Sequence, residues 1–325
     1  MAEYRFITKL HNIKLDSKMN KGKKIDDLSR ISNSYENFLE LFNNVDFKSK
    51  IGELEFNAFQ NSTYLYQKVT FEDKERIFDD ESTRIHFLDY QLSKVQAFLN
   101  MLWLVKDNGI TVENGFLHIK HEDNGNSISS NGLFVSPSNS LGEKEIVTFT
   151  KEEIDLAIKY YKTLDFTEVN ERLNKGIEKL RTENPLLKKY NRLERALYFI
   201  QVARNESVLP IRIMHYCTIL ETLFSTDNRE ISHQVSERFA RFLGENSEER
   251  KGLFKLVKTA YSVRSKAVHG QPVNQDLKTL KNISMDIDCS LRKFFIKVLN
   301  NNDIVEQFEQ NNEQLQNYFL DLVMN

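Results

Sequence analysis

Residues 247–270 read SEERKGLFKLVKTAYSVRSKAVHG, and this stretch carries the clearest helical pattern of the second half of the chain. Its apolar residues recur at the spacing of one helix face: Leu253, Phe254, Leu256, Val257, Ala260 and Tyr261. The six basic residues are Arg250, Lys251, Lys255, Lys258, Arg264 and Lys266; they stand against Glu248 and Glu249, so the local charge is +4. The stretch predicts an amphipathic helix over 247–268 with a basic face, followed by Gly270.

Arg264 and His269 stand at the end of this helix with four residues between them. RNA is cleaved without a metal when one group takes the proton of the 2′-hydroxyl, another protonates the leaving oxygen, and a cation stabilises the added charge. Histidine performs either proton transfer near neutral pH, and the planar guanidinium of arginine binds phosphate oxygens. The pair therefore favours a site for attack on phosphate. The plain alternative is a solvated basic face.

Arg264 and His269 do not meet on a straight helix, because five residues turn the helix through about 500° and leave the side chains about 140° apart. They converge only if the arginine wraps, if the helix ends before Gly270, or if a second copy of the chain completes the site. A single histidine does not easily act as acid and base in one step, which favours a shared site.

From residue 151 onward strand patterns disappear and apolar residues follow helical spacing. Pro185 and Pro210 stand where helices should begin, and Gly244 stands where one should end. Short connections between amphipathic helices indicate an antiparallel bundle. The predicted helices cover residues 151–163, 166–182, 186–205, 210–225, 229–243, 247–268, 273–300 and 302–323.

Residues 1–150 mix strand-like and helical patterns and predict an α/β domain. The expected elements are strands at 3–15, 111–120 and 146–150, a hairpin over 51–71, and helices at 33–43 and 82–106. The stretch 123–142 is rich in Gly, Asn and Ser and predicts a flexible loop. We therefore expect an α+β chain, with a mixed α/β domain at 1–150 and an all-α domain at 151–325.

Length and composition set the broad class of the protein. A chain of 325 residues favours two domains, and 40% hydrophobic with 28% charged residues is typical of a soluble globular protein. The net charge of −2 argues against a surface coated for non-specific nucleic-acid binding. Cys217 and Cys289 are too few for a disulfide framework or a zinc cluster. Because neither a signal peptide nor a long apolar window is present, we expect a cytoplasmic protein without membrane contact.

Other polar constellations are weaker candidates for a site. His118 and His121 resemble metal ligands, but on a strand they point to opposite faces, which favours an exposed strand end. His215 and His233 are expected to be packed or capping residues of helices. Aromatic residues between 38 and 71 are expected in the core rather than as a base-stacking platform. Motifs for a nucleotide loop, a zinc helix or a serine nucleophile do not occur, so we expect no cofactor and no metal.

The stretch ILETLFSTDNREISHQVSERFARFLG (219–244), followed by ERKGLFKLVKTAYSVRSKAVHG (249–270), resembles the HEPN superfamily, and most closely its ApeA-like branch. The matching elements stand in the family's order: Leu220-Glu221, Glu230-Ile231, Ser236-Glu237-Arg238, Leu243-Gly244, Tyr261 and the run from Arg264 to Gly270. The likeness covers roughly residues 187–300.

This resemblance implies a helical bundle that dimerises, so that two such motifs face one another and form a metal-independent endoribonuclease leaving 2′,3′-cyclic phosphate ends. It implies that His269 is the catalytic histidine, that Arg264 binds the phosphate, and that Glu221 orients the arginine. Ser265 and Lys266 follow the arginine as supporting polar residues. Where toxins controlled by nucleotidyltransferase antitoxins carry a tyrosine, this chain has Gln271, so that control is not expected.

The leading hypothesis is a cytoplasmic homodimeric ribonuclease of the antiphage, abortive-infection or toxin type. The domain 1–150 is expected to select RNA or to sense a phage-derived or nucleotide trigger, with the loop 123–142 as the contact. One rival is a non-catalytic HEPN module that binds RNA or protein. Another is a structural protein whose Arg264 and His269 make contacts inside the bundle. The acidic last helix, 303–325, either packs on the bundle or a second subunit, or masks the basic edge.

Overall fold

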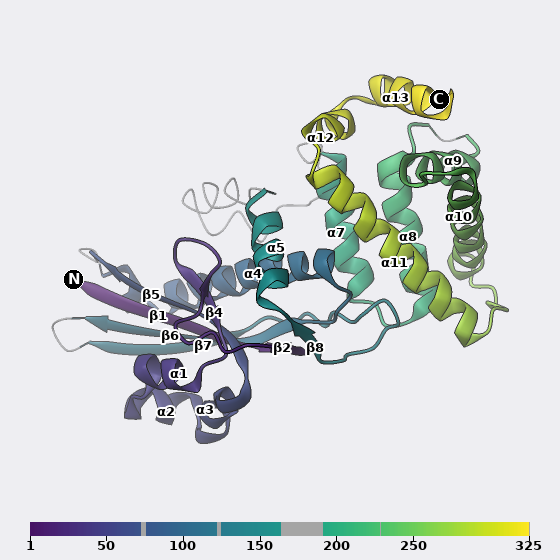
Figure 1. The fold of residues 1–325 in the computed structure, drawn as a ribbon. Helices are drawn as coiled ribbons and strands as arrows, with labels where there is room; N and C mark the ends of the chain where they lie inside the picture. The colour runs from purple at the N-terminus through teal and green to yellow at the C-terminus, as the bar shows by residue number, and fades with distance from the viewer. Residues whose placement is uncertain (73–75, 122–124, 164–190, 228, 325) are drawn as a thin grey trace. The chain divides into compact units, whose positions relative to one another are not determined.

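The chain forms two compact units in a computed structural model that describes residues 1–72, 76–121, 125–163, 191–227 and 229–324. The first unit comprises Met1–Val135 and Lys144–Lys162, and the second comprises Ser136–Glu143 and Thr163–Asn325. Sheets with helices precede a largely helical region (Figure 1), so the predicted α+β class is confirmed. The units differ from the predicted boundary at residue 150 in two segments. Residues 136–143 belong to the second unit, and residues 151–162 belong to the first.

A six-stranded antiparallel sheet is the frame of the first unit. Its strands, in spatial order, are β3 (Lys23–Lys24), β4 (Ser29–Ser32), β5 (Thr63–Phe71), β1 (Ala2–His11), β6 (Thr111–His121) and β7 (Asn126–Gly132). Phe6 and Ile7 of β1 are adjacent and both fully buried, because this strand has apolar partners on both faces of the sheet. After Asn12 the chain continues as β2 (Ile13–Leu15), which pairs in parallel with β8 (Val147–Phe149).

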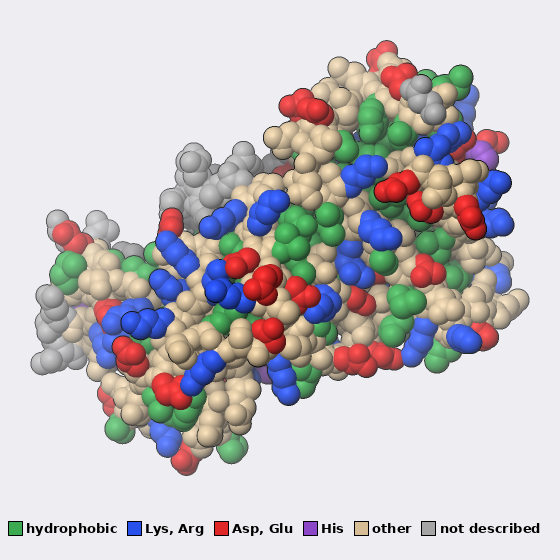
Figure 2. Space-filling view, viewed as in Figure 1, with side chains coloured by type: hydrophobic (Ala, Val, Ile, Leu, Met, Phe, Trp, Pro, Cys, Tyr) green, Lys and Arg blue, Asp and Glu red, His purple; other side chains and the backbone are tan. Residues whose placement is uncertain are grey.

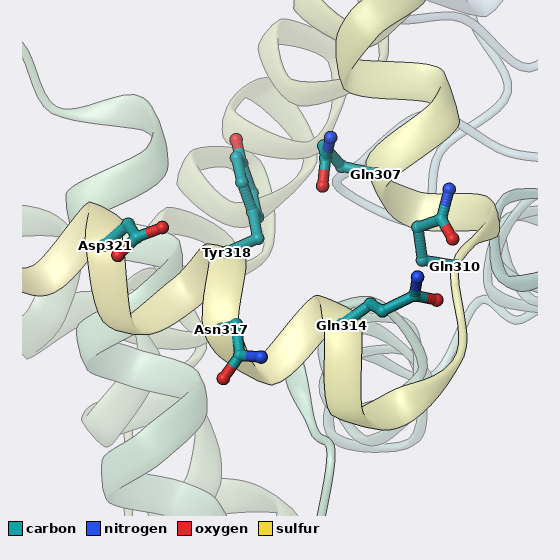
Figure 3. Close-up of a pocket in the computed structure, with 6 residues that line it drawn as sticks. All are labelled: Gln307, Gln310, Gln314, Asn317, Tyr318 and Asp321. Atoms are coloured by element: carbon teal, nitrogen blue, oxygen red, sulfur yellow. The ribbon is translucent and has the colours of Figure 1, made fainter.

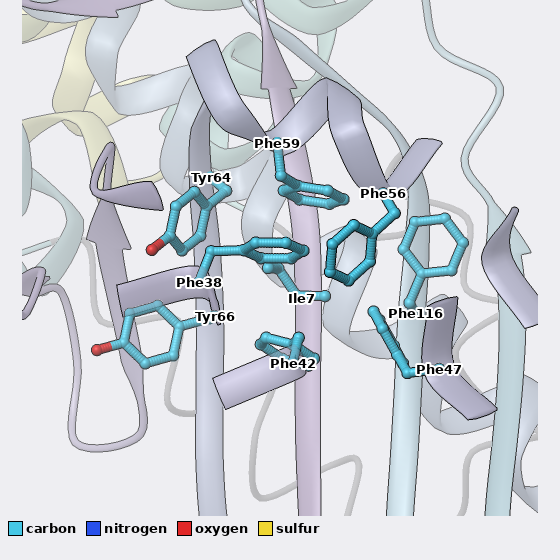
Figure 4. Close-up of a cluster of buried hydrophobic side chains, with 9 residues drawn as sticks. All are labelled: Ile7, Phe38, Phe42, Phe47, Phe56, Phe59, Tyr64, Tyr66 and Phe116. Carbon is cyan, nitrogen blue, oxygen red and sulfur yellow. The ribbon is translucent and has the colours of Figure 1, made fainter. Parts of the chain in front are cut away.

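Three short helices cover aromatic residues of this sheet: α1 (Tyr35–Phe42), α2 (Val45–Ile51) and α3 (Glu53–Ala58). Together with the strands they bury one cluster (Figure 4): Ile7, Phe38, Phe42, Phe47, Phe56, Phe59, Tyr64, Tyr66 and Phe116. These aromatic residues are core residues, as predicted. The long helix α4 (Glu81–Val105) packs on β6 and β7 and carries the only tryptophan of the chain, Trp103, which is buried.

The hairpin predicted over 51–71 is wrong in its first half. Residues 53–58 form α3, Phe59–Asn61 form a 3-10 turn, and only Thr63–Phe71 is a strand. Phe56 and Phe59 are buried whereas Leu54 is 90% exposed, so the apolar residues lie three apart on one side of a helix. Short apolar runs fit both the helical and the strand period, which explains the error.

The loop predicted over 123–142 is wrong for Asn126–Gly132, while residues 133–142 form neither a helix nor a strand. Asn126–Gly132 form the edge strand β7, and Ser136–Glu143, which we name the polar segment, belong to the second unit. Four residues of the polar segment are buried: Pro137, Ser138, Asn139 and Ser140. Gly142 turns with φ of 79°, and a Cβ there would lie 2.6 Å from the Ser207 carbonyl oxygen.

A buried arginine holds the polar segment in place. Arg212 lies on α8 (Leu209–Phe224) with 0% of its surface exposed. Its guanidinium donates to the Ser138 hydroxyl and the Asn139 carbonyl, and also to the Arg204 carbonyl at 3.2 Å and the Glu206 carbonyl at 2.8 Å. The short polar side chains that suggested a solvated loop are therefore hydrogen-bond partners inside the second unit.

The described helices of the second unit form a bundle around α8 (Figure 1). Besides α8 they are α7 (Arg192–Arg204), α9 (Ile231–Leu243), α10 (Ser247–Val268), α11 (Leu277–Leu299), α12 (Asn302–Glu309) and α13 (Asn312–Met324). α8 packs against α7, α10 and α11, and α9 packs against α10. The helix predicted at 166–182 and the start of the one at 186–205 lie outside the described residues.

The helix predicted at 151–163 is α5 (Lys151–Thr163), most of which belongs to the first unit. Thr150 and Glu153 form its expected capping box.

The helix predicted over 302–323 is two helices, because the chain turns at Gln310 and Asn311. Phe308 of α12 and Phe319 of α13 both pack on Phe224 of α8, at ring-centroid distances of 5.9 and 5.6 Å. This aromatic packing supports the interpretation that the acidic C-terminal helices complete the bundle.

His118 on β6 gives the first unit a dependence on pH. The imidazole is buried against Phe47, and burial, followed by Lys120 and Arg5, lowers the pKa of His118 from 6.5 to about 4. Below pH 6.5 the unfolded chain takes up a proton that the folded chain does not take up until about pH 4. The free energy of unfolding should therefore fall between these values, by up to about 3 kcal/mol.

Urea unfolding followed by Trp103 fluorescence at several pH values measures this effect. His118→Leu should make the decline in this window shallower, whereas His86→Gln, at a half-buried position on α4, should leave its steepness unchanged. The prediction would be contradicted if the free energy of unfolding fell equally steeply from pH 6.5 to 4 in the wild type and in His118→Leu.

Candidate functional site

The C-terminus of α10 fixes the position of His269. The helix ends at Val268, and His269 is the C-cap with φ of −89° and ψ of 9°. Gly270 follows with φ of 64°; its N–H donates to the Ala267 carbonyl at 3.3 Å, and the Gln271 N–H donates to the Lys266 carbonyl at 2.9 Å. These two bonds form a Schellman motif, in which glycine occupies the left-handed position without strain. The prediction that the helix ends before Gly270 is confirmed.

The imidazole of His269 lies on the surface. His269 is exposed, and its backbone N–H donates to the Ser265 carbonyl at 3.2 Å. Within the part of the chain that the structure describes, no hydrogen bond or ion pair of its side chain is found. The ring is therefore free to meet a ligand or a second copy of the chain, and the structural alternative, with His269 in contacts inside the bundle, lacks support.

Arg264 faces the neighbouring helix α8 instead. Its Nη2 lies 3.3 Å from Oε1 of Glu221, in an ion pair whose side chains are 35% and 23% exposed. This is a single contact rather than a bidentate one, so other guanidinium donors remain for an incoming anion. The structure thus brings Glu221 and Arg264 together, as the resemblance implies.

Cys217 of α8 and Tyr261 of α10 lie beneath this ion pair. Burial, followed by the Glu221 carboxylate, raises the pKa of both groups far above their ordinary values. Both therefore stay protonated near neutral pH, so neither serves as a base or as an activated nucleophile. Of this group, only the Arg264 guanidinium suits the binding of a phosphate.

The predicted site residues fall into two sets. Glu221 accompanies Arg264, while Ser265 and Lys266 lie on the side of α10 that carries His269, within about 60° of it on an ideal helix. Ser265 is exposed and Lys266 is half-exposed. The structure does not bring Arg264 and His269 into contact within one chain. The predicted wrapping of the arginine is therefore not seen, and completion of the site by a second copy of the chain stays a prediction.

The other histidines do not join this site. His215 is half-buried on α8, where burial lowers its pKa, and it lies about 120° around the helix from Glu221. His233 is exposed at the start of α9, with its ring 5.5 Å from the Phe254 ring. His121 Nε2 lies 3.5 Å from an Asp79 carboxylate oxygen. Among the described residues, no group of three or more His, Cys, Asp or Glu is placed to hold a metal ion.

Comparisons of the chain with protein-family models, with curated proteins and with solved structures gave no match. The HEPN resemblance of residues 219–270 therefore stays a prediction. The chemistry open to the site follows from its own residues and geometry.

The hairpin of α12 and α13 holds a pocket of about 450 Å³ that sequence reasoning missed (Figure 3), lined by Gln307, Gln310, Gln314, Asn317, Tyr318 and Asp321. Because these polar side chains come from two helices not predicted to be separate, the sequence pattern gave no sign of it. No helix in the described ranges is both long enough and apolar enough to cross a membrane.

Proposed function

We propose that this protein is a metal-independent endoribonuclease in which Arg264 binds the scissile phosphate and His269 transfers protons, at a site completed by a second copy of the chain. The observation that carries the proposal is the end of α10, where an exposed histidine follows an arginine that keeps free guanidinium donors. The HEPN resemblance of residues 219–270 supports the same function.

The chemistry needs no group beyond these side chains. A base removes the proton of a ribose 2′-hydroxyl, and that oxygen attacks the adjacent phosphorus. The bond to the 5′-oxygen breaks, and an acid protonates the leaving oxygen. The products are a 2′,3′-cyclic phosphate and a 5′-hydroxyl end. Histidine suits both proton transfers, and the guanidinium of Arg264 stabilises the negative charge that grows on the phosphate.

Two copies of the chain meet the requirement for two proton-transfer groups. One chain supplies one exposed histidine near Arg264, and its imidazole cannot be base and acid in the same step. In a two-fold symmetric dimer, the same surface of each copy faces its counterpart, so two copies of the helix end would supply two histidines and two arginines to one cleft. The proposed active form is therefore a homodimer.

The resemblance also suggests a cellular role, which we propose with the activity. The protein would be a cytoplasmic effector of the antiphage, abortive-infection or toxin type that cleaves RNA. The first unit, which is separate from the helical one, would select RNA or sense a phage-derived or nucleotide trigger.

A second candidate function is a HEPN-type module that binds RNA or a protein without cutting. The observation that favours it is the ion pair with Glu221, which holds the Arg264 guanidinium against α8. In that case the exposed helix end would hold an anionic partner but perform no proton transfer.

Cleavage in the presence of EDTA decides between these functions. Purified protein should degrade labelled RNA in excess chelator, and the fragments should carry 2′,3′-cyclic phosphate ends that acid converts to monophosphates. Persistence of intact RNA at all protein concentrations, together with measurable RNA binding, would favour the non-catalytic module instead.

Arg264→Lys tests the role of the guanidinium. Lysine keeps the charge but loses the planar fork that binds two phosphate oxygens, so the cleavage rate should fall by about 10²-fold. Stability should change by less than about 1 kcal/mol, since the ion pair with Glu221 is partly exposed. Rates on a labelled RNA and thermal melts measure the two effects. The matched control is Arg229→Lys at an exposed position, which should keep full activity.

A further inference from the structure

The exposed face of α10 carries a row of cations that ends at His269. Lys251, Lys255 and Lys258 are exposed, and on an ideal helix they fall with His269 within about 60° of arc. We name these three residues the lysine stripe. From Lys251 to His269 the helix rises about 27 Å, so the stripe leads along the helix toward the candidate catalytic residue.

The lysine stripe is not neutralised by the protein itself. In the described ranges, none of its three ammonium groups lies within ion-pair distance of a carboxylate; Lys258 instead donates to the Ser232 hydroxyl at 3.2 Å. Lysines elsewhere do pair, for example Lys48 with Glu53 and Lys281 with Glu143. Cations left unpaired along one face repel one another and attract a polyanion.

Acidic residues nearby are few and partly engaged. Glu248 and Glu249 lie in the first turn of α10, and the Glu249 carboxylate accepts hydrogen bonds from the Glu245 N–H and the Asn246 side chain. Glu237 of α9 lies beside the stripe. In Figure 2, Lys and Arg side chains are visible along the edge of the helical unit that α9 and α10 occupy, with acidic side chains among them.

A groove between α9 and α10 adjoins the stripe. Its volume is about 330 Å³, and Lys251 and Lys255 line it together with Arg241, Arg250 and Phe254. Phe254 is half-buried, and its ring meets the exposed His233 ring at a centroid distance of 5.5 Å. Aromatic faces beside cations are what proteins use to bind single-stranded nucleic acid, because bases stack on the rings while phosphates meet the cations.

We propose that the lysine stripe and this groove bind single-stranded RNA, with its backbone along α10 toward His269. One row of cations matches one row of phosphates, whereas a duplex presents two. The direction toward His269 rests on the proposed function, but binding itself requires only the charges and the rings.

RNA binding without cleavage tests the surface. All variants carry His269→Ala and are measured in EDTA by fluorescence anisotropy with a labelled 20-nucleotide single-stranded RNA. A triple variant of the lysine stripe should bind RNA at least tenfold more weakly at low salt; it combines Lys251→Gln, Lys255→Gln and Lys258→Gln. The slope of log affinity against log salt should also become shallower by about 2, because each phosphate that a lysine neutralises contributes roughly 0.7 to it. Phe254→Leu should weaken binding about tenfold while leaving that slope unchanged.

The control removes the same charge elsewhere. Arg229, Lys278 and Lys293 are exposed in the second unit outside α10, and their combined change to Gln should leave affinity and slope unchanged. Equal losses in both triple variants, tighter binding of duplex than of single strand, or binding of polyglutamate in place of RNA would each overturn the proposal. If the stripe binds RNA but the wild type never cuts it, the proposed function fails alone. If the wild type cuts and the stripe variant binds normally, this inference fails alone.

Discussion

His269→Ala should abolish RNA cleavage and leave the fold intact. Acid–base catalysis by a positioned side chain contributes about 10²–10⁴-fold to a rate, so the variant should lose at least that factor. The imidazole is exposed, and His269 is the C-cap of α10. Its side chain therefore takes no part in the backbone hydrogen bonds of the helix. Stability should therefore change by no more than about 0.5 kcal/mol. Cleavage of labelled RNA and circular-dichroism melts measure the two quantities.

His233→Ala is the matched control, because His233 is exposed on α9 of the same unit. It should retain cleavage. Full activity in His269→Ala would remove the acid–base role. A large drop in the melting temperature of His269→Ala would instead favour the purely structural rival, in which the histidine holds the bundle together.

Mixing experiments examine whether two histidines act together. When wild-type chains are refolded with an excess of His269→Ala chains, activity should fall as the square of the wild-type fraction, because only a dimer of two wild-type chains holds both groups. A linear fall would mean that each chain acts alone, and it would contradict the shared site while leaving the ribonuclease proposal in place.

Arg212→Ala should strongly destabilise the helical unit. The guanidinium is fully buried and donates to Ser138, Asn139, Arg204 and Glu206, so its removal deletes all four of these hydrogen bonds. Breaking such a buried charged network costs about 3–5 kcal/mol. The polar segment would then lose its main attachment. Urea unfolding followed by far-ultraviolet circular dichroism measures the loss in the free energy of unfolding. The signal reports mainly on the second unit, because most of the described helical residues lie there.

Trp103 supplies an internal reference for this experiment, because the only tryptophan of the chain lies on α4 of the first unit. The fluorescence transition should shift less than the dichroism transition. Arg229→Ala, at an exposed position, should shift neither. A free energy of unfolding within about 1 kcal/mol of the wild type would contradict the assigned role of Arg212.

The helix that carries the candidate site was predictable because its signals are local. Asn246 caps its start by accepting hydrogen bonds from Glu248 and Glu249, and Gly270 ends it, so both boundaries follow from neighbouring residue types. The α+β class was predictable for the same reason, since period-two patterns are confined to the first half of the chain, where they alternate with helical patterns, and the second half has helical patterns alone. The pairing of Glu221 with Arg264 was implied by the resemblance and could not be read from spacing.

Apart from the hairpin predicted over 51–71, the errors occur where distant residues decide the structure. The polar segment is held by Arg212, which lies 73 residues from Asn139 and 74 from Ser138, and no local pattern connects them. The turn between α12 and α13 has Gln310 and Asn311 instead of Gly or Pro, so the helical pattern continues through it. In both cases tertiary contacts override what the neighbouring residues indicate.

The polar segment also has a consequence for how this protein can be divided. The chain passes from one unit to the other after Val135, after Glu143 and again after Lys162, so neither unit is one continuous stretch of sequence. A single junction after Lys162 would leave the bundle without the backbone and hydroxyl groups that Arg212 contacts, and a single junction after Val135 would leave the first unit without Lys144–Lys162. No single cut in the chain therefore yields both units whole, and either unit expressed alone requires two segments of the sequence joined together.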